Sequence, residues 1–590
     1  MIKNLFFVIS IIILHTFICS GQTIASSKNK TFDFKKKLAI RLNEFSQIHD
    51  KYTKLKPEEL YKQYEGLTIE QITVKVIDPV GLSVDKPTND SLSSFAKFIN
   101  KVTFNTPKRY AYKLLLFEEG DIIEASIFAQ TEKNIRDNPH NKDILIKIIP
   151  IDSCSAKVEV IMQDKLSGYI SPDIAGDRIG IGIDYNSFLG YPIEMLQSVA
   201  LNYDAKNIIR YQTHLYWNQI KKSRVRIGPD IYLDRRNQYY GWKMERNFVS
   251  EKTRWAGRFD NYFYRQNINY DGTSNRENHL FRNTTWLAFS LNPKIKNEAW
   301  NSSRIILSAN AYINQYTKRP FAEDKDKREY YFIRRFYIAS IGIANWNYYK
   351  EKNIFNPNRF SFLPRGLNAN ISLGVDYFEK QKNKLYLGVA VNYSIYPKKA
   401  GYIFIESKLA SYFNQYNNNE FDLKLRLNYI SPLYNIKKWS CRYFVYNQMQ
   451  LYFNKPKEIP FSTNQIIGYS DKRAFYSSQN YTLNIEPVVY CPYSFAGFNL
   501  SLFAFADIGV FGISNSNTSL LYNRQLTQAY GVGFRLNNPD IGLGFIEVSF
   551  AYYPNNISDY NFNYQIPVSF YNRKSYDNYN LFDPDYSNTR

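Results

Sequence analysis

The chain has 590 residues, a mean hydropathy of −0.43 and a formal net charge of +22 at pH 7. No stretch after residue 21 approaches the roughly 20 apolar residues that a membrane-spanning helix needs, which excludes a helical membrane protein. The basic residues are scattered, without a recognition helix or an RNA-binding aromatic motif, so nucleic acid is not an expected partner. Cations that line a lumen, and loops that face anionic lipid headgroups, account for the charge more simply.

Residues 1–21 have the layout of a secretory signal peptide. Lys3 precedes the apolar run at 5–14, and small residues follow at Ser20 and Gly21. Cys19 raises the alternative of a lipoprotein signal, but the three residues before it, TFI, are not the small residues that such a signal places next to its cysteine. We therefore expect an exported chain.

Residues 22–65 read as a polar linker followed by a solvated helical stretch. The next hundred residues alternate between strand and helix patterns, and Asp121 is the expected N-cap of the second helix. The expected order is strand 67–79, helix 91–104, helix 122–138, strand 143–151 and strand 156–165. This order predicts one small α+β domain at 66–165.

Four segments of the second half alternate between apolar and polar or small residues, as strands with two different faces do. They are 385–395, 421–429, 531–536 and 545–554. In the third, GVGFRL, Val532 and Phe534 would meet hydrocarbon while Arg535 faces a polar lumen. Aromatic residues make up 17% of the chain, and membrane barrels place such side chains in girdles at both interfaces.

We therefore predict an all-β transmembrane β-barrel at 166–560, followed by a tail at 561–590. At roughly 25 residues per strand and connection, it would have about 16 antiparallel strands. The two long alternating runs, 385–395 and 421–429, would also fit an exposed sheet of a soluble sandwich. The apolar face of that sheet would then need a second sheet to cover it.

The element order of 66–165 resembles a POTRA domain, the periplasmic module of the BamA/TamA outer-membrane assembly superfamily. KLLLFEEGD at 113–121 leads into the second helix, and Asn134, Ile135 and Arg136 lie near its end. In the barrel, STNQIIGYSDKRAF at 462–475, then LNIEPVVY, FAFADIGVF and GVGFRL, look like the superfamily's loop motif and its last strands. The likeness is strongest over the final 100 residues.

The superfamily's loop motif is an arginine-glycine-aromatic triplet that folds back into the lumen, where the arginine meets acidic residues. Gly468 and Tyr469 match this triplet, but Ile467 stands in place of the arginine. Arg473, or Lys472, is the expected substitute cation. The alternative is that IIGY is an ordinary loop turn.

Two acids are candidate lumen partners, together with Arg535. Glu486 shares a face with Asn484, opposite the apolar Leu483 and Ile485, so it should face the lumen. Asp507 alternates with the phenylalanines at 503 and 505, which predicts the lipid side unless a bulge near Gly509 turns it. An unpaired lumen carboxylate would protonate or recruit a cation.

Catalytic residues are not expected. The sequence has no Gly-x-Ser-x-Gly elbow, phosphate loop or His-Glu-x-x-His helix, and its histidines lie far apart. The cysteines that follow the signal, Cys154, Cys441 and Cys491, are odd in number and widely spaced, which implies neither a disulfide framework nor a metal site. We expect no cofactor and no metal.

The resemblance implies a non-enzymatic protein that inserts polypeptides into, or moves them across, the outer membrane of a Gram-negative type cell. Its POTRA domain would lie in the periplasm and bind unfolded or secreted clients along a sheet edge, with accessory periplasmic proteins as possible partners. Clients would enter the membrane at a seam between a strand near 180–203 and one near 545–554. The alternatives are a transport channel or surface-binding barrel without assembly activity, and a soluble secreted adhesin.

Overall fold

The computed structural model describes residues 56–571, which all belong to one compact unit. Residues 1–55, with the expected signal peptide, and 572–590 lie outside the described residues. The gaps within the range are 89–91, 93, 139, 176–177, 203–207, 221–222, 235–236, 270–274, 293–301, 320–331, 355–356, 358, 380–382, 398–399, 414–418, 454–458, 462–474, 496–497, 514–521, 539–544, 555–563 and 566–567.

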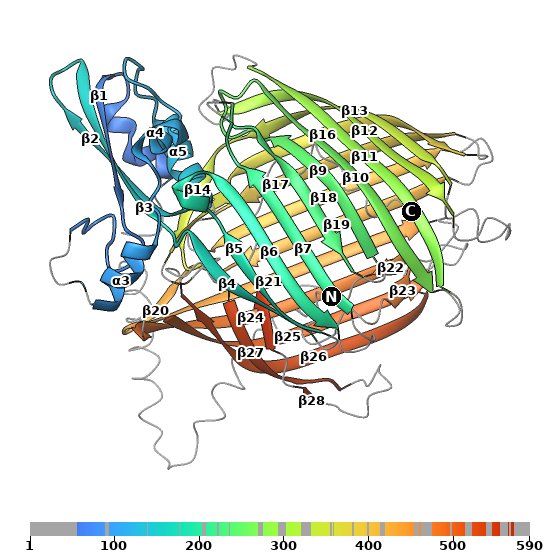
Figure 1. Cartoon of the computed structure of the whole chain (residues 1–590). Coiled ribbons are helices and arrows are strands. Elements are labelled where there is room, and N and C mark those ends of the chain that lie inside the picture. The colour runs from blue at the N-terminus through green and yellow to red at the C-terminus, as the bar shows by residue number, and fades with distance from the viewer. Residues whose placement is uncertain are drawn as a thin grey trace, which may run out of the picture. The chain divides into compact units, whose positions relative to one another are not determined.

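The N-terminal part is an α+β domain. Two short 3-10 turns, η1 (Pro57–Leu60) and η2 (Lys62–Tyr64), lead into its sheet and helices: β1 (Thr68–Ile77), α3 (Ser94–Val102), α4 (Lys108–Leu114), α5 (Ala125–Asp137), β2 (Asn141–Pro150) and β3 (Ser155–Asp164). The sheet order is β1-β3-β2, with β1 parallel to β3 and β2 antiparallel to it. Helices α4 and α5 pack against the sheet (Figure 1).

The structure corrects two expectations about this domain. Asp121 does not cap α5: the helix begins after Glu124 with no side-chain cap, and the Asp121 carboxylate instead accepts a hydrogen bond from the Glu118 N–H at 2.8 Å. The core also reaches upstream of residue 66, because Tyr61 is buried in it with its ring 5.5 Å from that of Phe128. Part of the expected linker is therefore part of the domain.

Most of the remaining described chain forms a closed antiparallel barrel (Figure 1). Its long strands are β4 (Gly168–Ala175), β5 (Arg178–Tyr185), β6 (Ile193–Asn202), β7 (Ile208–Trp217), β8 (Arg226–Leu233), β9 (Asn237–Arg246), β10 (Trp255–Asn269), β11 (Asn275–Leu291), β12 (Ser303–Lys318), β13 (Arg334–Asn345), β16 (Gly366–Phe378), β17 (Lys384–Ile395), β18 (Tyr402–Phe413), β19 (Glu420–Ile430), β21 (Trp439–Phe453), β24 (Gln479–Phe495), β25 (Phe498–Ile513), β26 (Tyr522–Asn537) and β27 (Phe545–Tyr552). Among the described residues these are 19 strands of eight residues or more, against the about 16 expected; β20 (Tyr434–Ile436), β28 (Tyr564–Gln565) and β29 (Val568–Tyr571) are short additions.

The barrel includes chain that we had expected to be tail, since β28 and β29 fall after residue 560. The strand order places β29 beside β4, so the seam joins these two strands and not the expected 180–203 with 545–554.

The two faces of the strands differ as the sequence pattern predicts. In β26 the outward Val532 is 59% exposed, whereas the inward Arg535 is 3% exposed. In β17, Leu385 and Tyr393 are exposed while Asn392 and Ser394 are buried. The transmembrane barrel is thus confirmed, with an apolar outer face and a polar interior. None of the helices among the described residues has the length and hydrophobicity to cross a membrane.

Successive connections alternate between two ends of the barrel. We call the end that carries the turns after β5, β7 and β9 the domain end, because the α+β domain contacts those turns. Asn218 after β7 bonds His140 at 3.1 Å, and the Asn134 amide donates to the Val249 carbonyl, after β9, at 2.6 Å. The opposite end is called the far end.

Candidate functional site

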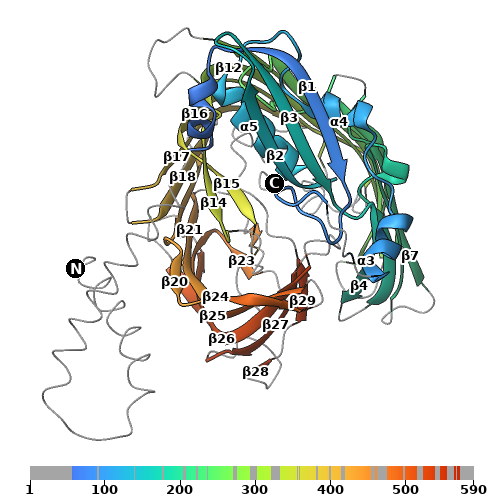
Figure 2. The same cartoon turned by 90° about the vertical axis from the view of Figure 1, so that its left-hand side faces the viewer.

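A hairpin fills the lumen at the domain end. It consists of β14 (Tyr348–Lys352) and β15 (Phe360–Pro364), lies in the connection between β13 and β16, and forms its own two-stranded sheet rather than joining the wall. Figure 2, which looks along the barrel, shows it inside the ring of strands. We call β14 and β15, with the described residues between them, the plug hairpin.

Apolar side chains hold the plug hairpin from both flanks. Leu363 is fully buried in a cluster with inward-facing residues of the later strands, among them Phe444 of β21 and Val488 of β24. Tyr348 and Phe362 join a second cluster with Trp286 and Trp346 on the opposite flank. Burying several aromatic and aliphatic side chains at about 1.5–3 kcal/mol each makes the hairpin a stable part of the resting barrel.

Polar contacts fix the register of the plug hairpin in the lumen. Arg442 of β21 is 0% exposed, and it donates to a Glu351 carboxylate oxygen at 3.0 Å and to the Lys352 carbonyl at 2.9 Å. On the same side, the Tyr490 hydroxyl donates to the Asn353 carbonyl at 2.9 Å. Removing one partner of such a buried ion pair strongly destabilises the protein, because the other charge stays buried without its partner.

Helix α5 of the α+β domain contacts the outer side of the plug hairpin. The Lys350 ammonium lies 2.6 Å from a carboxylate oxygen of Glu132, which also accepts from Arg136 at 3.0 Å. The Lys133 ammonium lies 4.9 Å from the centre of the Tyr348 ring, a cation–π contact. A displacement of α5 would therefore remove contacts that hold the plug hairpin.

A second cluster lies in the wall near the end of the chain, around Arg535 of β26. Its guanidinium donates to both carboxylate oxygens of Glu486 on β24, at 2.8 and 2.5 Å, and to Glu547 on β27 at 2.6 Å. It also lies 3.8 Å from the centre of the Phe503 ring on β25. One cation thus ties four consecutive strands together inside the lumen.

The structure brings the predicted residues Glu486 and Arg535 into contact. Glu486 is not an unpaired carboxylate, because Arg535 neutralises it. Sequence reasoning missed Glu547, although FIEVSFAYYP carried the signal: Glu547 alternates with the apolar Ile546 and Val548, which predicts an inward position.

Asp507 is a correction. It does share a face with Phe503 and Phe505, but that face is the lumen: all three side chains are at least 96% buried, and no bulge at Gly509 is needed. The reason lies in the neighbouring strand, where Phe503 pairs with Gly533 and Phe505 pairs with Gly531. The two rings occupy the space that the glycines leave, since a Cβ on either glycine would come within 2.6 Å of a ring carbon.

The loop motif residues Ile467, Gly468, Tyr469 and Arg473 lie outside the described residues. Their role, and an interaction of Arg473 with Glu486, stay predictions. Over the described ranges, no group of three His, Cys, Asp or Glu side chains is placed to hold a metal ion.

Comparisons with known proteins found distant structural likenesses. No family model and no curated protein matches the chain. Among solved structures it is similar to CdiB from Escherichia coli (9% identity, 92% of this chain and 98% of that chain, TM-score 0.41), CdiB from Acinetobacter baumannii (9%, 92% and 98%, 0.38) and BamA from Haemophilus ducreyi lacking POTRA domains 1–3 (11%, 85% and 83%, 0.32).

The chain is a transmembrane β-barrel with an N-terminal α+β domain. It is similar to the BamA and CdiB barrels, at identities and TM-scores so low that the assignment of the fold rests on the chain's own strand order.

Proposed function

We propose that this protein sits in the outer membrane of a Gram-negative type cell, with its α+β domain in the periplasm, and moves polypeptides into or across that membrane. The observation that carries the proposal is the plug hairpin: the lumen is obstructed at the end where the α+β domain binds, and α5 contacts the obstruction. Because the lumen is closed at rest and the α+β domain contacts the hairpin that closes it, client binding to that domain could open the lumen.

Clients would first bind the edge of the domain's sheet as an added strand, through main-chain hydrogen bonds that require no particular sequence. The sheet order leaves β1 and β2 as edges, and β1 is partly covered, because the Ile72 N–H donates to Glu119 and its carbonyl accepts from Tyr112. On strand β2 the carbonyls of Lys142 and Ile144 accept from Arg359 and Arg136, so the second half of this strand is the better acceptor. Its end carries the exposed Ile149, and Ile151 follows in the turn.

The charge of the lumen argues against the alternative of an anion channel. Several inward-facing cations are neutralised by neighbouring carboxylates: Arg334 lies 2.6 Å from Asp376, Arg426 lies 2.9 Å from Glu406, and Lys384 lies 2.5 Å from Glu420. Paired charges fix the wall and leave little net attraction for a passing anion.

Depletion of the protein tests the proposal. We expect the levels of other outer-membrane proteins, or of one secreted protein, to fall in the membrane and medium fractions while their transcripts stay constant. A passive channel or surface-binding barrel predicts unchanged protein levels, and that result would contradict the proposal.

A further inference from the structure

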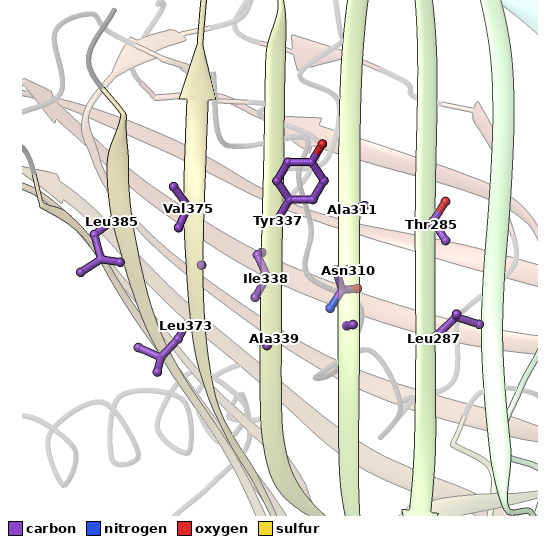
Figure 3. Close-up of a pocket in the computed structure, with 12 residues that line it drawn as sticks. Thr285, Leu287, Asn310, Ala311, Tyr337, Ile338, Ala339, Leu373, Val375 and Leu385 are labelled. Atoms are coloured by element: carbon purple, nitrogen blue, oxygen red, sulfur yellow. The ribbon is translucent and has the colours of Figure 1, made fainter.

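An apolar groove crosses the outer face of the barrel over β11, β12, β13, β16 and β17 (Figure 3). Its volume is about 530 Å³. Small residues, Ala309, Ala311, Ala339 and Gly374, form its floor, and Leu287, Tyr337, Leu373 and Leu385 stand around it.

The groove follows from which residues pair across the strands. In one row, Ala309 and Ala339 lie side by side between Leu287 and Leu373, so two adjacent strands carry only methyl groups between two large side chains. The next row towards the domain end contains Leu307, Ile341 and Ile371, which close the groove on that side.

The occupant of this groove has to be hydrocarbon. Leu287, Ile341, Leu373 and Leu385 around it are each at least 50% exposed, as side chains that face lipid are. The groove is shallow and open, and its lining offers water almost no hydrogen-bonding partner, so contact with water there is unfavourable. Side chains two residues apart along a strand lie about 6.6 Å apart, so the four outward positions from 335 to 341 span roughly 20 Å, enough for one acyl chain of one leaflet.

A cation stands at the far end of the groove. Arg335 is exposed and faces outward, two residues before Tyr337 on β13 and opposite Tyr377 on β16. The rings of Tyr337 and Tyr377 meet edge to face with centres 6.1 Å apart, as in the aromatic belt at a membrane interface. By contrast the preceding Arg334 points into the lumen, where it binds Asp376.

We propose that this groove binds a phosphate-bearing lipid of the far-end leaflet, with one acyl chain along Ala311, Ala309 and Ala339 and the phosphate at the Arg335 guanidinium. Arginine binds phosphate oxygens in a bidentate manner, and each buried methylene of the chain contributes about 0.8 kcal/mol. The proposal requires the barrel to be in a membrane but does not depend on polypeptide movement.

Native mass spectrometry of the full chain in detergent tests the site, with phosphatidylglycerol or phosphatidylcholine of the same acyl chains added. We expect one tightly retained phosphatidylglycerol. The double variant Ala309→Leu/Ala339→Leu fills the groove and should weaken retention on the order of tenfold, equivalent to about two buried methylenes. Arg335→Gln should keep acyl-chain binding but lose the preference for phosphatidylglycerol.

The controls are Ala504→Leu, an outward alanine on β25, and Arg265→Gln, an outward arginine on β10; both should retain lipid as the unaltered protein does. The proposal would be overturned if the double variant retained phosphatidylglycerol as well as the unaltered protein does. It would also be overturned if Ala504→Leu lost as much lipid as the double variant. If the double variant does not fold, a photoreactive phosphatidylglycerol on the unaltered protein decides: labelling concentrated on β12 and β13 supports the site, and labelling spread evenly around the barrel contradicts it.

Discussion

The Arg535 guanidinium is shared by two buried carboxylates, those of Glu486 and Glu547. Its removal would take this cation away from both carboxylates in a confined lumen. A buried charge without a partner lowers the stability of the fold far more than the loss of both partners does. The effect of a mutation in this cluster therefore depends on which charges are left in place.

We therefore expect Arg535→Met to destabilise the barrel by about 3–5 kcal/mol. The temperature at which the folded, fast-migrating band disappears on SDS gels should fall. Adding Glu486→Gln and Glu547→Gln should restore most of the loss. If Arg535→Met leaves this temperature unchanged, our account of the cluster is wrong.

A buried acid in the α+β domain predicts a dependence on pH. Burial raises the pKa of Asp164 to about 7, although the carboxylate accepts hydrogen bonds from the Thr106 N–H at 2.6 Å and the Asn141 amide at 3.1 Å. The folded domain then holds a proton that the unfolded chain releases near pH 4. Between about pH 4 and 7 this group's contribution to stability falls as the pH rises.

The comparison with Asp164→Asn isolates this contribution. Burial lowers the pKa of His140 to about 4, which acts in the opposite direction, but that effect is common to both proteins. Over the rise from pH 4 to 7, the free energy of unfolding of the unaltered domain should drop relative to the variant, by up to about 4 kcal/mol. A constant difference across this range would show that Asp164 titrates normally.

At the scale of elements, the α+β domain should fold as an isolated fragment, provided that it starts near residue 56 so that Tyr61 is present. Phe117 is buried and stacks on Phe128 with ring centres 4.2 Å apart. Phe117→Ala should cost about 3–5 kcal/mol in denaturant unfolding. Phe98→Ala is the control, because the Phe98 ring on α3 is 61% exposed and its loss should cost little.

The plug hairpin makes a prediction about permeability. Glu351→Gln removes the charge that faces Arg442 and leaves that guanidinium buried without its carboxylate, which should loosen the hairpin. In planar bilayers we expect more frequent and larger conductance openings than in the unaltered protein. Lys352→Gln is the matched control, since the Lys352 side chain is exposed and only its carbonyl contacts Arg442. Equal conductance in both variants would mean that the hairpin does not obstruct the lumen.

The sequence predicted those features that repeat with the period of the strand. Alternation identified the barrel and the inward direction of Arg535 and Glu486, because each strand reports its own two faces. Alternation failed where the neighbouring strand determines which face is buried. Phe503 and Phe505 look like lipid-facing residues in the sequence, but they pair with Gly533 and Gly531 on the next strand, which leave room for their rings in the lumen. Which residues of two neighbouring strands pair with each other cannot be deduced from the sequence of either strand alone.

The plug hairpin was missed for a related reason. YYKEK and FSFLP are short, and in the sequence they resemble two more wall strands. Only the surrounding lumen, with Arg442 and the aromatic clusters, shows that they turn inward. The extra helix α4 was also missed, since at seven residues it offers too few turns for a periodic pattern.

For the whole molecule, the central claim is that the plug hairpin has to move when a client passes. In a background with Cys154, Cys441 and Cys491 replaced by serine, Glu351→Cys and Arg442→Cys would be bridged by a short reducible linker. The same linker between Glu406→Cys and Arg426→Cys is the control, because it joins two adjacent wall strands.

The decisive measurement follows a client protein, meaning one whose level falls when this barrel protein is depleted. It is the amount of that client that reaches the membrane or medium when the cell contains only the cross-linked barrel protein. Our account predicts that the plug bridge blocks this delivery, that reduction of the linker restores it, and that the wall bridge has no effect. Normal delivery with the plug bridged would contradict the account.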